Sequence, residues 1–236
     1  RQKRLSYSFK VIPHIQQLDH PIPSKKHHPL RSKIIGCKVI KYCTINLSLH
    51  YKYFLKIMKK IPNDALGRIS PEEFIRMKRC PVVVVLDNIR SMNNVGSFFR
   101  TGDAFAIERI ILCGITGTPP NREIHKTALG AELTVPWEYQ KSTLDAVERL
   151  KAENYTLLAV EQVEGAVSLD RWEPGPDFRI ALIFGNEVEG VQQAVVDLCD
   201  GAIEIPQMGT KHSLNVSVSG GAVLWEAFRH WIQTKK

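Results

Sequence analysis

The sequence lacks several of the patterns that assign a chain to a common protein class. No apolar run approaches the roughly 20 residues of a membrane-spanning helix, and none follows the basic residues 1–4 to complete a secretory signal. The five cysteines are scattered without a CxxC pair, which argues against a disulfide framework and a zinc knuckle. These absences predict a protein of a reducing compartment, the cytoplasm, with no membrane association. We also expect no metal site, because the histidines before residue 60 lack metal-ligand spacing.

Acidic residues are almost absent from the first quarter of the chain. Residues 1–60 hold 14 of the 32 Lys and Arg residues but only one of the 24 acids, Asp19, so the formal net charge of +8 originates there. The rest of the chain carries 18 basic and 23 acidic residues. Bulk charge therefore favours a nucleic-acid partner only for the N-terminal part.

Residues 1–57 also lack the periodicity of a folded domain. Four prolines interrupt the first half, and the apolar stretch 37–54 shows neither clean alternation nor turn residues. Regular patterning begins near Met58. We therefore expect 1–57 to be a basic leader that is non-native or poorly structured, with a basic RNA-binding arm as the alternative. A short helical segment, 58–79, should follow it.

From residue 70 onward the sequence alternates helical and strand patterns. Ser70, Pro71 and Glu73 form a helix-start signature, with the helix expected to run to about Arg79. Residues 81–87 are a continuous, mostly β-branched run, typical of a strand buried on both faces of a parallel sheet. We expect further strands at 109–113, 133–138, 155–161, 179–184 and 201–205, helices at 95–106, 121–129, 142–153, 188–199 and 213–233, and a loop at 162–178. This alternation predicts an α/β fold over 80–236, with a mostly parallel sheet flanked by helices.

The expected C-terminal helix, 213–233, begins among small and hydroxyl residues. Ser213 is the candidate N-cap. The apolar residues that recur at helical spacing predict the buried face; they are Val218, Ala222, Trp225, Phe228 and Ile232, with Leu224 beside them.

Polar, glycine-containing stretches follow three of the expected strands, at 88–100, 185–191 and 206–215. Ligands of parallel sheets bind beyond the carboxyl ends of the strands, so these stretches are candidates for a site. None contains GxGxxG, a P-loop or GxSxG, so a dinucleotide site of the Rossmann type and an α/β-hydrolase nucleophile lack support. An ordinary nucleotide-binding α/β enzyme stays a distant alternative. In the first stretch, Arg100 is either functional or a structural partner of Asp103 or Glu187.

Taken in order, the three stretches resemble the three motifs of the SpoU/TrmH family of RNA ribose 2′-O-methyltransferases, in the SPOUT superfamily. The matching residues are Asn94, Gly96, Arg100, Thr101, Asp103, Ala104 and Phe105 in the first stretch, Phe184, Gly185, Glu187 and Gly190 in the second, and Ile205, Pro206, Gly209 and 213–217 in the third. Met92, Gly102 and Gln207 depart from the family pattern.

The resemblance implies a SPOUT-like fold with a C-terminal trefoil knot, S-adenosylmethionine as cofactor, and a homodimer with an interface formed by helices 95–106 and 213–233. The residues implied to bind the cofactor are Val160, Gly185, Ile205, Ser213 and Leu214. The implied reaction is methylation of a ribose 2′-hydroxyl in structured RNA, with tRNA favoured over rRNA. The alternative is a non-catalytic RNA-binding relative of the same fold.

Catalytic roles follow from the same resemblance. Arg100 would contact the 2′-hydroxyl, as a base or, as we favour because an Arg side chain stays charged, as an electrostatic stabiliser. Asn94 would orient Arg100 or the ribose, and Glu187 would anchor the Arg side or the loop that follows residue 205. Ser213 and Asn215 would shape the start of the last helix beside the methyl donor.

Overall fold

The computed structural model describes residues 59–235. The predicted leader, 1–57, lies outside the described residues. The description below concerns the unit Asp64–Lys236.

A seven-stranded sheet forms the centre of this unit, in the order β3-β2-β1-β6-β4-β7-β5, and every strand pairing in it is parallel. The strands are β1 (Cys80–Asp87), β2 (Ile107–Cys113), β3 (Trp137–Gln140), β4 (Thr156–Val160), β5 (Val167–Ser168), β6 (Ile180–Phe184) and β7 (Gly201–Glu204). The β-branched run 82–85 lies in β1 between β2 and β6 and is fully buried, as expected for a central parallel strand. The predicted α/β fold with a parallel sheet is confirmed.

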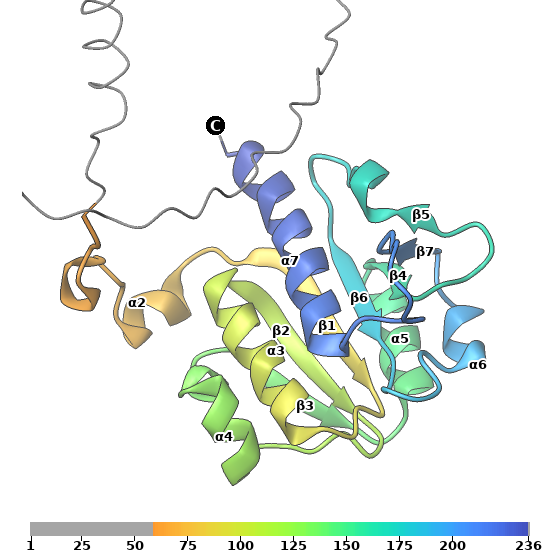
Figure 1. Ribbon diagram of the computed structural model, residues 1–236, viewed down its shortest axis with the longest axis horizontal. Helices are drawn as coiled ribbons and strands as arrows, with labels where there is room; N and C mark the ends of the chain where they lie inside the picture. The colour runs from red at the N-terminus through yellow and green to blue at the C-terminus, as the bar shows by residue number, and fades with distance from the viewer. Residues whose placement is uncertain (1–58, 236) are drawn as a thin grey trace, which may run out of the picture. The chain divides into compact units, whose positions relative to one another are not determined.

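Helices cover both faces of the sheet (Figure 1). They are α2 (Pro71–Arg76), α3 (Met92–Ala104), α4 (Arg122–Ala128), α5 (Thr143–Ala152), α6 (Gln193–Val196) and α7 (Val216–Gln233), with single 3₁₀ turns η1 (Asn63–Ala65), η2 (Ala131–Leu133) and η3 (Leu169–Arg171). The predicted helix start at Ser70 is confirmed: Ser70 and Glu73 form a reciprocal capping box. Among residues 59–235 we find no helix with both the length and the apolar character that a membrane crossing requires.

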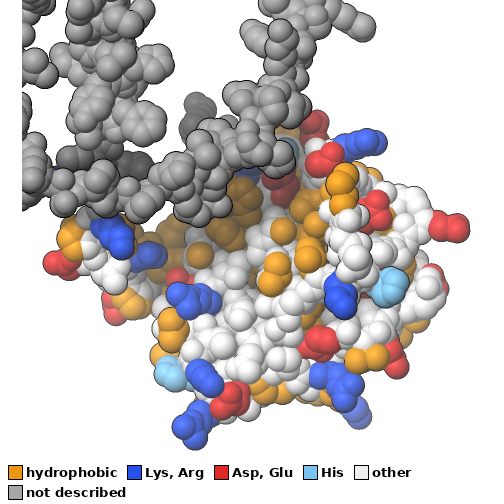
Figure 2. All heavy atoms as spheres, in the orientation of Figure 1, with side chains coloured by type: hydrophobic (Ala, Val, Ile, Leu, Met, Phe, Trp, Pro, Cys, Tyr) orange, Lys and Arg blue, Asp and Glu red, His pale blue; other side chains and the backbone are white. Residues whose placement is uncertain are grey.

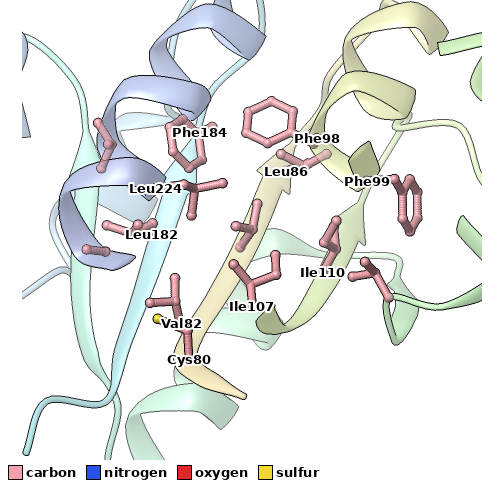
Figure 3. Close-up of a cluster of buried hydrophobic side chains, with 14 of the residues drawn as sticks. Cys80, Val82, Leu86, Phe98, Phe99, Ile107, Ile110, Leu182, Phe184 and Leu224 are labelled. Atoms are coloured by element: carbon pink, nitrogen blue, oxygen red, sulfur yellow. The ribbon is translucent and has the colours of Figure 1, made fainter. Parts of the chain in front are cut away.

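Alternate residues of β1 supply two hydrophobic layers. Val82, Val84 and Leu86 pack with α3 and α7, whereas Val83 and Val85 pack with α5 and α6. Figure 3 shows the first layer, where Phe98 of α3 lies against Phe184 of β6 with ring centroids 5.0 Å apart. This layer ties α3 and α7 to the strands that end at the candidate site.

The buried face predicted for the last helix is only partly right: Leu224 is buried and Phe228 and Ile232 pack against the core, but Val218 and Trp225 do not. The residues of α7 that face the core are Gly220, Val223, Leu224, Ala227 and Trp231. Val218 is 57% exposed and Trp225 is 48% exposed. The helix is apolar on more than one face, and its close approach to α3 at Gly220 selects the face that is buried, which periodicity alone could not decide. Figure 2 shows the remaining hydrophobic side chains gathered along α7 at the surface.

Several predicted boundaries also differ from the structure. Helix α6 covers only Gln193–Val196, because residues 185–191 form a turn and not the start of a helix at 188. The predicted loop 162–178 contains the short strand β5 and the turn η3. Helix α3 begins at Met92, three residues earlier than predicted, because Ser91 accepts a hydrogen bond from the backbone N–H of Asn94 and serves as its N-cap.

Candidate functional site

A cavity of about 540 Å³ opens at the carboxyl ends of β4, β6 and β7. Its volume is in the range of small-molecule and cofactor sites. The lining residues are 160–162, 184–190, 203–205, Gln207, 212–216 and Ser219. Two of the three polar stretches singled out in the sequence therefore meet here, at the edge of the sheet where ligands of parallel α/β proteins bind.

A tight hairpin, residues 185–191, forms one wall of the cavity. Asn186 and Gly190 exchange two backbone hydrogen bonds of 3.1 Å each, and the Asn186 side chain accepts from the N–H groups of Val188 and Glu189. Gly190 has φ of +71°, which favours glycine. A Cβ on Gly185 would lie 1.9 Å from the carbonyl carbon of Gly190, so only glycine lets the two ends of the hairpin approach each other.

Glu187 projects from this hairpin to the loop after β1. Its carboxylate accepts hydrogen bonds from the backbone N–H groups of Arg90 and Ser91, each at 3.1 Å, and from Nδ2 of Asn94 at 2.8 Å. Desolvation acts to raise the pKa of Glu187, but the hydrogen bonds from Arg90, Asn94 and Ser91 outweigh it and hold the pKa below its ordinary value. The first and second motif stretches are thereby joined through one ionised carboxylate.

Asn94 joins all three stretches. Besides donating to Glu187, its Oδ1 accepts from Nδ2 of Asn215 at 3.2 Å and from Oγ of Ser217 at 3.3 Å. Asn215 is also the N-cap of α7, since its Oδ1 accepts from the backbone N–H groups of Ser217 and Val218. The cap predicted at Ser213 is therefore wrong: the helix begins at Val216, and Ser213 lies in the loop before it.

All five residues predicted to bind a cofactor line the cavity: Val160, Gly185, Ile205, Ser213 and Leu214. Of the predicted catalytic residues, Glu187, Ser213 and Asn215 line it as well, and Asn94 is joined to two of them by hydrogen bonds. The structure thus brings eight of the nine predicted site residues together.

Arg100 is the exception. It is exposed on α3 and does not line the cavity. The alternative structural role, a bridge to Asp103 or Glu187, is not formed: Asp103 accepts from Oγ1 of Thr134, and Glu187 accepts from the donors named above. Within residues 59–235 neither carboxylate pairs with Arg100.

Charge in the cavity wall has one sign. Four glutamates line it, Glu161, Glu187, Glu189 and Glu204, and none of the lining residues is Lys or Arg. A site for a phosphate-bearing nucleotide normally offers cations or a glycine-rich helix start, whereas this lining suits a ligand with positive charge. Residues 59–235 contain no group of three His, Cys, Asp or Glu side chains placed to hold a metal ion.

Three residues that were not among the predicted catalytic or cofactor-binding residues also support or line the site. Glu161 accepts from the backbone N–H of Val191 at 3.0 Å, Ser217 donates to Asn94, and Asp87 is fully buried at the end of β1. Asp87 carried a usable signal, since a carboxylate that ends a buried strand requires partners. Glu161 follows β4 in the same way.

Comparisons with known proteins agree with this geometry. The model of the SpoU rRNA Methylase family matches residues 81–225. The 23S rRNA (guanosine-2′-O-)-methyltransferase RlmB of Vibrio parahaemolyticus is 27% identical over 164 residues, which cover 70% of this chain and 65% of that enzyme. The chain spans 58% to 67% of the length of the curated relatives it matches.

Solved structures share the fold. The AdoMet-bound rRNA methyltransferase of Sinorhizobium meliloti has a TM-score of 0.60 and 28% identity, with 69% of this chain and 61% of that chain covered. The A. aeolicus TrmH/SpoU tRNA modifying enzyme has a TM-score of 0.63 and 23% identity, covering 70% of this chain and 82% of that chain, and supports the fold alone. With its family model matched across the sheet, the cavity and most of α7, the chain belongs to the SpoU rRNA Methylase family.

Proposed function

We propose that this protein transfers a methyl group from S-adenosylmethionine to a ribose 2′-hydroxyl of structured RNA, with tRNA favoured over rRNA, in the cytoplasm. The observation that carries the proposal is that the second and third motif stretches line one cavity, while Asn94 of the first stretch is hydrogen-bonded to both Glu187 and Asn215. Membership of the family and the names of its relatives, an RNA (guanosine-2′-O-)-methyltransferase among them, support the same reaction.

The chemistry of the cavity fits this cofactor. S-adenosylmethionine supplies a methyl group made electrophilic by a positively charged sulfonium. A lining with four glutamates and no Lys or Arg suits that charge, and it disfavours the phosphates of NAD or ATP. Backbone groups of Gly185, Ile205 and Leu214 would hold the adenosine, with Val160 and Ser213 beside them. The acidic balance of residues beyond 60 is thus partly a property of the cofactor site.

The contacts of the polar residues refine their proposed roles. The side-chain amide of Asn94 is hydrogen-bonded to Glu187, Asn215 and Ser217. We therefore assign Asn94 to holding the 185–191 hairpin and the start of α7 in place, and not to orienting the ribose. Glu187 fixes the hairpin to the start of α3. Ser213 is exposed in the loop before α7 and is free to contact the ribose or the donor. The protein's main contribution is then to position the 2′-hydroxyl against the methyl group.

Arg100 would stabilise negative charge that develops on the 2′-oxygen as its proton leaves. An Arg guanidinium stays protonated, so electrostatic stabilisation and orientation suit it better than proton abstraction. Because Arg100 is exposed and outside the cavity, it must approach the reacting oxygen from the RNA side or from a second copy of the chain. Arg90, Arg100, Arg122, Lys126 and Lys211, all exposed, are the candidates for contacts with RNA phosphates. Figure 2 shows Lys and Arg side chains around α4.

A homodimer is part of the proposal. Its support is the exposed apolar face of α7, where Val218 and Trp225 face outward and the ring of Trp225 lies 5.8 Å from that of Phe105, at the end of α3. An exposed apolar patch of this kind marks an interaction surface. The predicted interface of α3 and α7 would cover it.

We also propose that the C-terminal segment forms a trefoil knot, as the family resemblance implies. In its support, the loop before α7 lies beside the segments that follow β4 and β6. Nε2 of Gln162, after β4, donates to the carbonyl of His212 at 2.7 Å, and the 185–191 hairpin, after β6, lines the same cavity as this loop. A knot is an exception to the rule that connections do not thread loops.

Methyl transfer from labelled S-adenosylmethionine to unmodified total tRNA, with rRNA in parallel, tests the proposal. The RNA is digested and its 2′-O-methylated nucleosides are identified. We expect a single such nucleoside from one RNA class. Label on a base, or no transfer to either RNA by a protein that binds the cofactor in calorimetry, would contradict the proposed reaction. Binding of RNA without the cofactor would support the non-catalytic alternative.

A further inference from the structure

Asp87 is a buried carboxylate with four hydrogen bonds and no cationic partner among the described residues. It ends β1 and is 0% exposed. Its Oδ1 accepts from Nδ2 of Asn88 at 2.8 Å, Oγ1 of Thr143 at 2.6 Å and Nε2 of Gln192 at 2.6 Å, and its Oδ2 accepts from the backbone N–H of Gln192 at 3.0 Å. A buried charge is costly, so this set of neutral donors must be retained for the site to stay intact.

Two of those four bonds come from Gln192, which directly follows the cavity hairpin 185–191. The hairpin is stiff within itself, because Asn186 and Gly190 pair through their backbones and Gly185 abuts Gly190. A stiff hairpin moves as a unit, so its placement depends on its anchors. The anchors are β6 on one side, the bonds of Glu187 to the start of α3 at the tip, and on the other side the bonds of Val191 to Glu161 and of Gln192 to Asp87.

The same hairpin carries groups that the proposed reaction needs. Gly185 lines the cofactor cavity, and Glu187 holds the start of α3 through Arg90, Ser91 and Asn94. A shift at Gln192 would therefore change both the cavity wall and the placement of Asn94. Asp87 lies outside the cavity lining, and its bonds to Gln192 connect it to the hairpin that lines the cavity.

We propose that Asp87 is a positioning residue that fixes the 185–191 hairpin through Gln192 and thereby sets the affinity for the cofactor. The inference rests on the proposed function, because it takes S-adenosylmethionine as the ligand of the cavity. Thr143 offers a matched comparison. It donates to the same oxygen of Asp87 over the same distance, 2.6 Å, but it belongs to α5 and is neither in the hairpin nor among the residues that line the cavity.

The test compares Gln192→Met with Thr143→Val in the full chain. Each substitution is close in size to the native residue and removes one hydrogen bond to Oδ1 of Asp87. We measure the dissociation constant of S-adenosylmethionine by calorimetry and the melting temperature of each variant. Gln192→Met should weaken cofactor binding about tenfold, the size expected for a lost hydrogen bond to a charged group, while Thr143→Val changes it less than about twofold. Gln192→Glu, which places a second carboxylate beside Asp87, should weaken binding more than Gln192→Met.

A positioning role predicts that the affinity for S-adenosylmethionine falls in the variants of Gln192, which release the hairpin, and not in Thr143→Val. This holds even if both substitutions lower the melting temperature. Equal losses of affinity in Gln192→Met and Thr143→Val, or wild-type affinity in Gln192→Glu, would overturn the inference and leave the proposed function standing. If the unaltered protein bound no S-adenosylmethionine, the cofactor assignment would fail first and the inference with it. Because binding is measured without RNA, the result does not depend on the identity of the substrate.

Discussion

Gly220 lies where α7 comes closest to α3, and replacing it by alanine tests how tightly these helices pack. A Cβ at this position would be 2.3 Å from Cε1 and 2.7 Å from Cζ of Phe98. Phe98 is buried and its ring packs on Phe184, so it has little room to move away (Figure 3). The adjacent Gly221 is the matched control, because a Cβ there meets nothing within 4 Å.

Two opposing terms set the size of the effect. Replacing glycine by alanine inside a helix raises the free energy of unfolding by about 0.5–1 kcal/mol, because it lowers the entropy of the unfolded chain. Overpacking a tight core costs about 1–3 kcal/mol. Gly220→Ala should therefore destabilise the protein by about 1–2 kcal/mol, and Gly221→Ala should stabilise it by up to about 1 kcal/mol. At about 2–4 °C per kcal/mol for a protein of this size, the two melting temperatures should differ by several degrees.

Circular dichroism during thermal and urea unfolding measures both variants. Each is run at two protein concentrations, because Gly221 lies near the exposed apolar face of α7 and a dimer contribution would depend on concentration. Gly220→Ala should also slow methyl transfer, since Asn94 of α3 bonds to Asn215 and Ser217 at the start of α7. Equal stability of the two variants would refute the close packing on which this reasoning rests.

Three further predictions follow from individual contacts. Because the pKa of Glu187 is lower in the folded protein than in the unfolded chain, its carboxylate stabilises the fold above the unfolded pKa. This stabilisation is lost as the pH falls through the folded pKa. The free energy of unfolding, measured as a function of acid pH, should show this loss in the wild type and not in Glu187→Gln. Arg100→Ala should lower the rate of methyl transfer by about a hundredfold or more while the calorimetric affinity for S-adenosylmethionine is unchanged, and near wild-type turnover would disprove the assigned role. Ser70→Ala removes the capping-box bond from the Glu73 N–H to Oγ of Ser70 and leaves the backbone donor of the other bond in place, so hydrogen exchange in α2 should speed up by the equivalent of about 1 kcal/mol, whereas Glu72→Gln should leave it unchanged.

Local chemistry in the sequence was sufficient to predict the sheet and the polar stretches at the strand ends, whereas the individual site residues came from the resemblance to the SpoU/TrmH family. The continuous β-branched run 82–85 is typical of a strand buried on both faces, and these residues are fully buried in β1. The polar stretches at strand ends meet because the carboxyl ends of parallel strands share one edge of a sheet. Strand assignment therefore placed these stretches at one edge of the sheet, and the family resemblance selected the cavity residues within them.

The remaining errors concern choices that only packing makes. Helix α7 has apolar residues around much of its circumference, and the closeness of Gly220 to Phe98 decides which face is buried. Asn215 is the N-cap because its side chain accepts from the backbone N–H groups of Ser217 and Val218. Serine and asparagine are both common N-caps, so residue type alone did not distinguish Ser213 from Asn215. The expected helix from 188 fails because Asn186 and Gly190 close a hairpin, a contact that a helical pattern cannot reveal. Asp87 was overlooked because its four donors come from three separate segments.

The order of the strands has a consequence for synthesis of the protein. Strand β1 pairs with β2 shortly after it is made, but its other neighbour, β6, ends only at residue 184. Until the ribosome has released that segment, the hydrophobic strand β1 has one open edge, which is the kind of surface that associates with other chains. Closing the centre of the sheet also requires a long loop to form first, which slows folding. A nascent chain should therefore be most in need of chaperones between completion of β2 and emergence of β6.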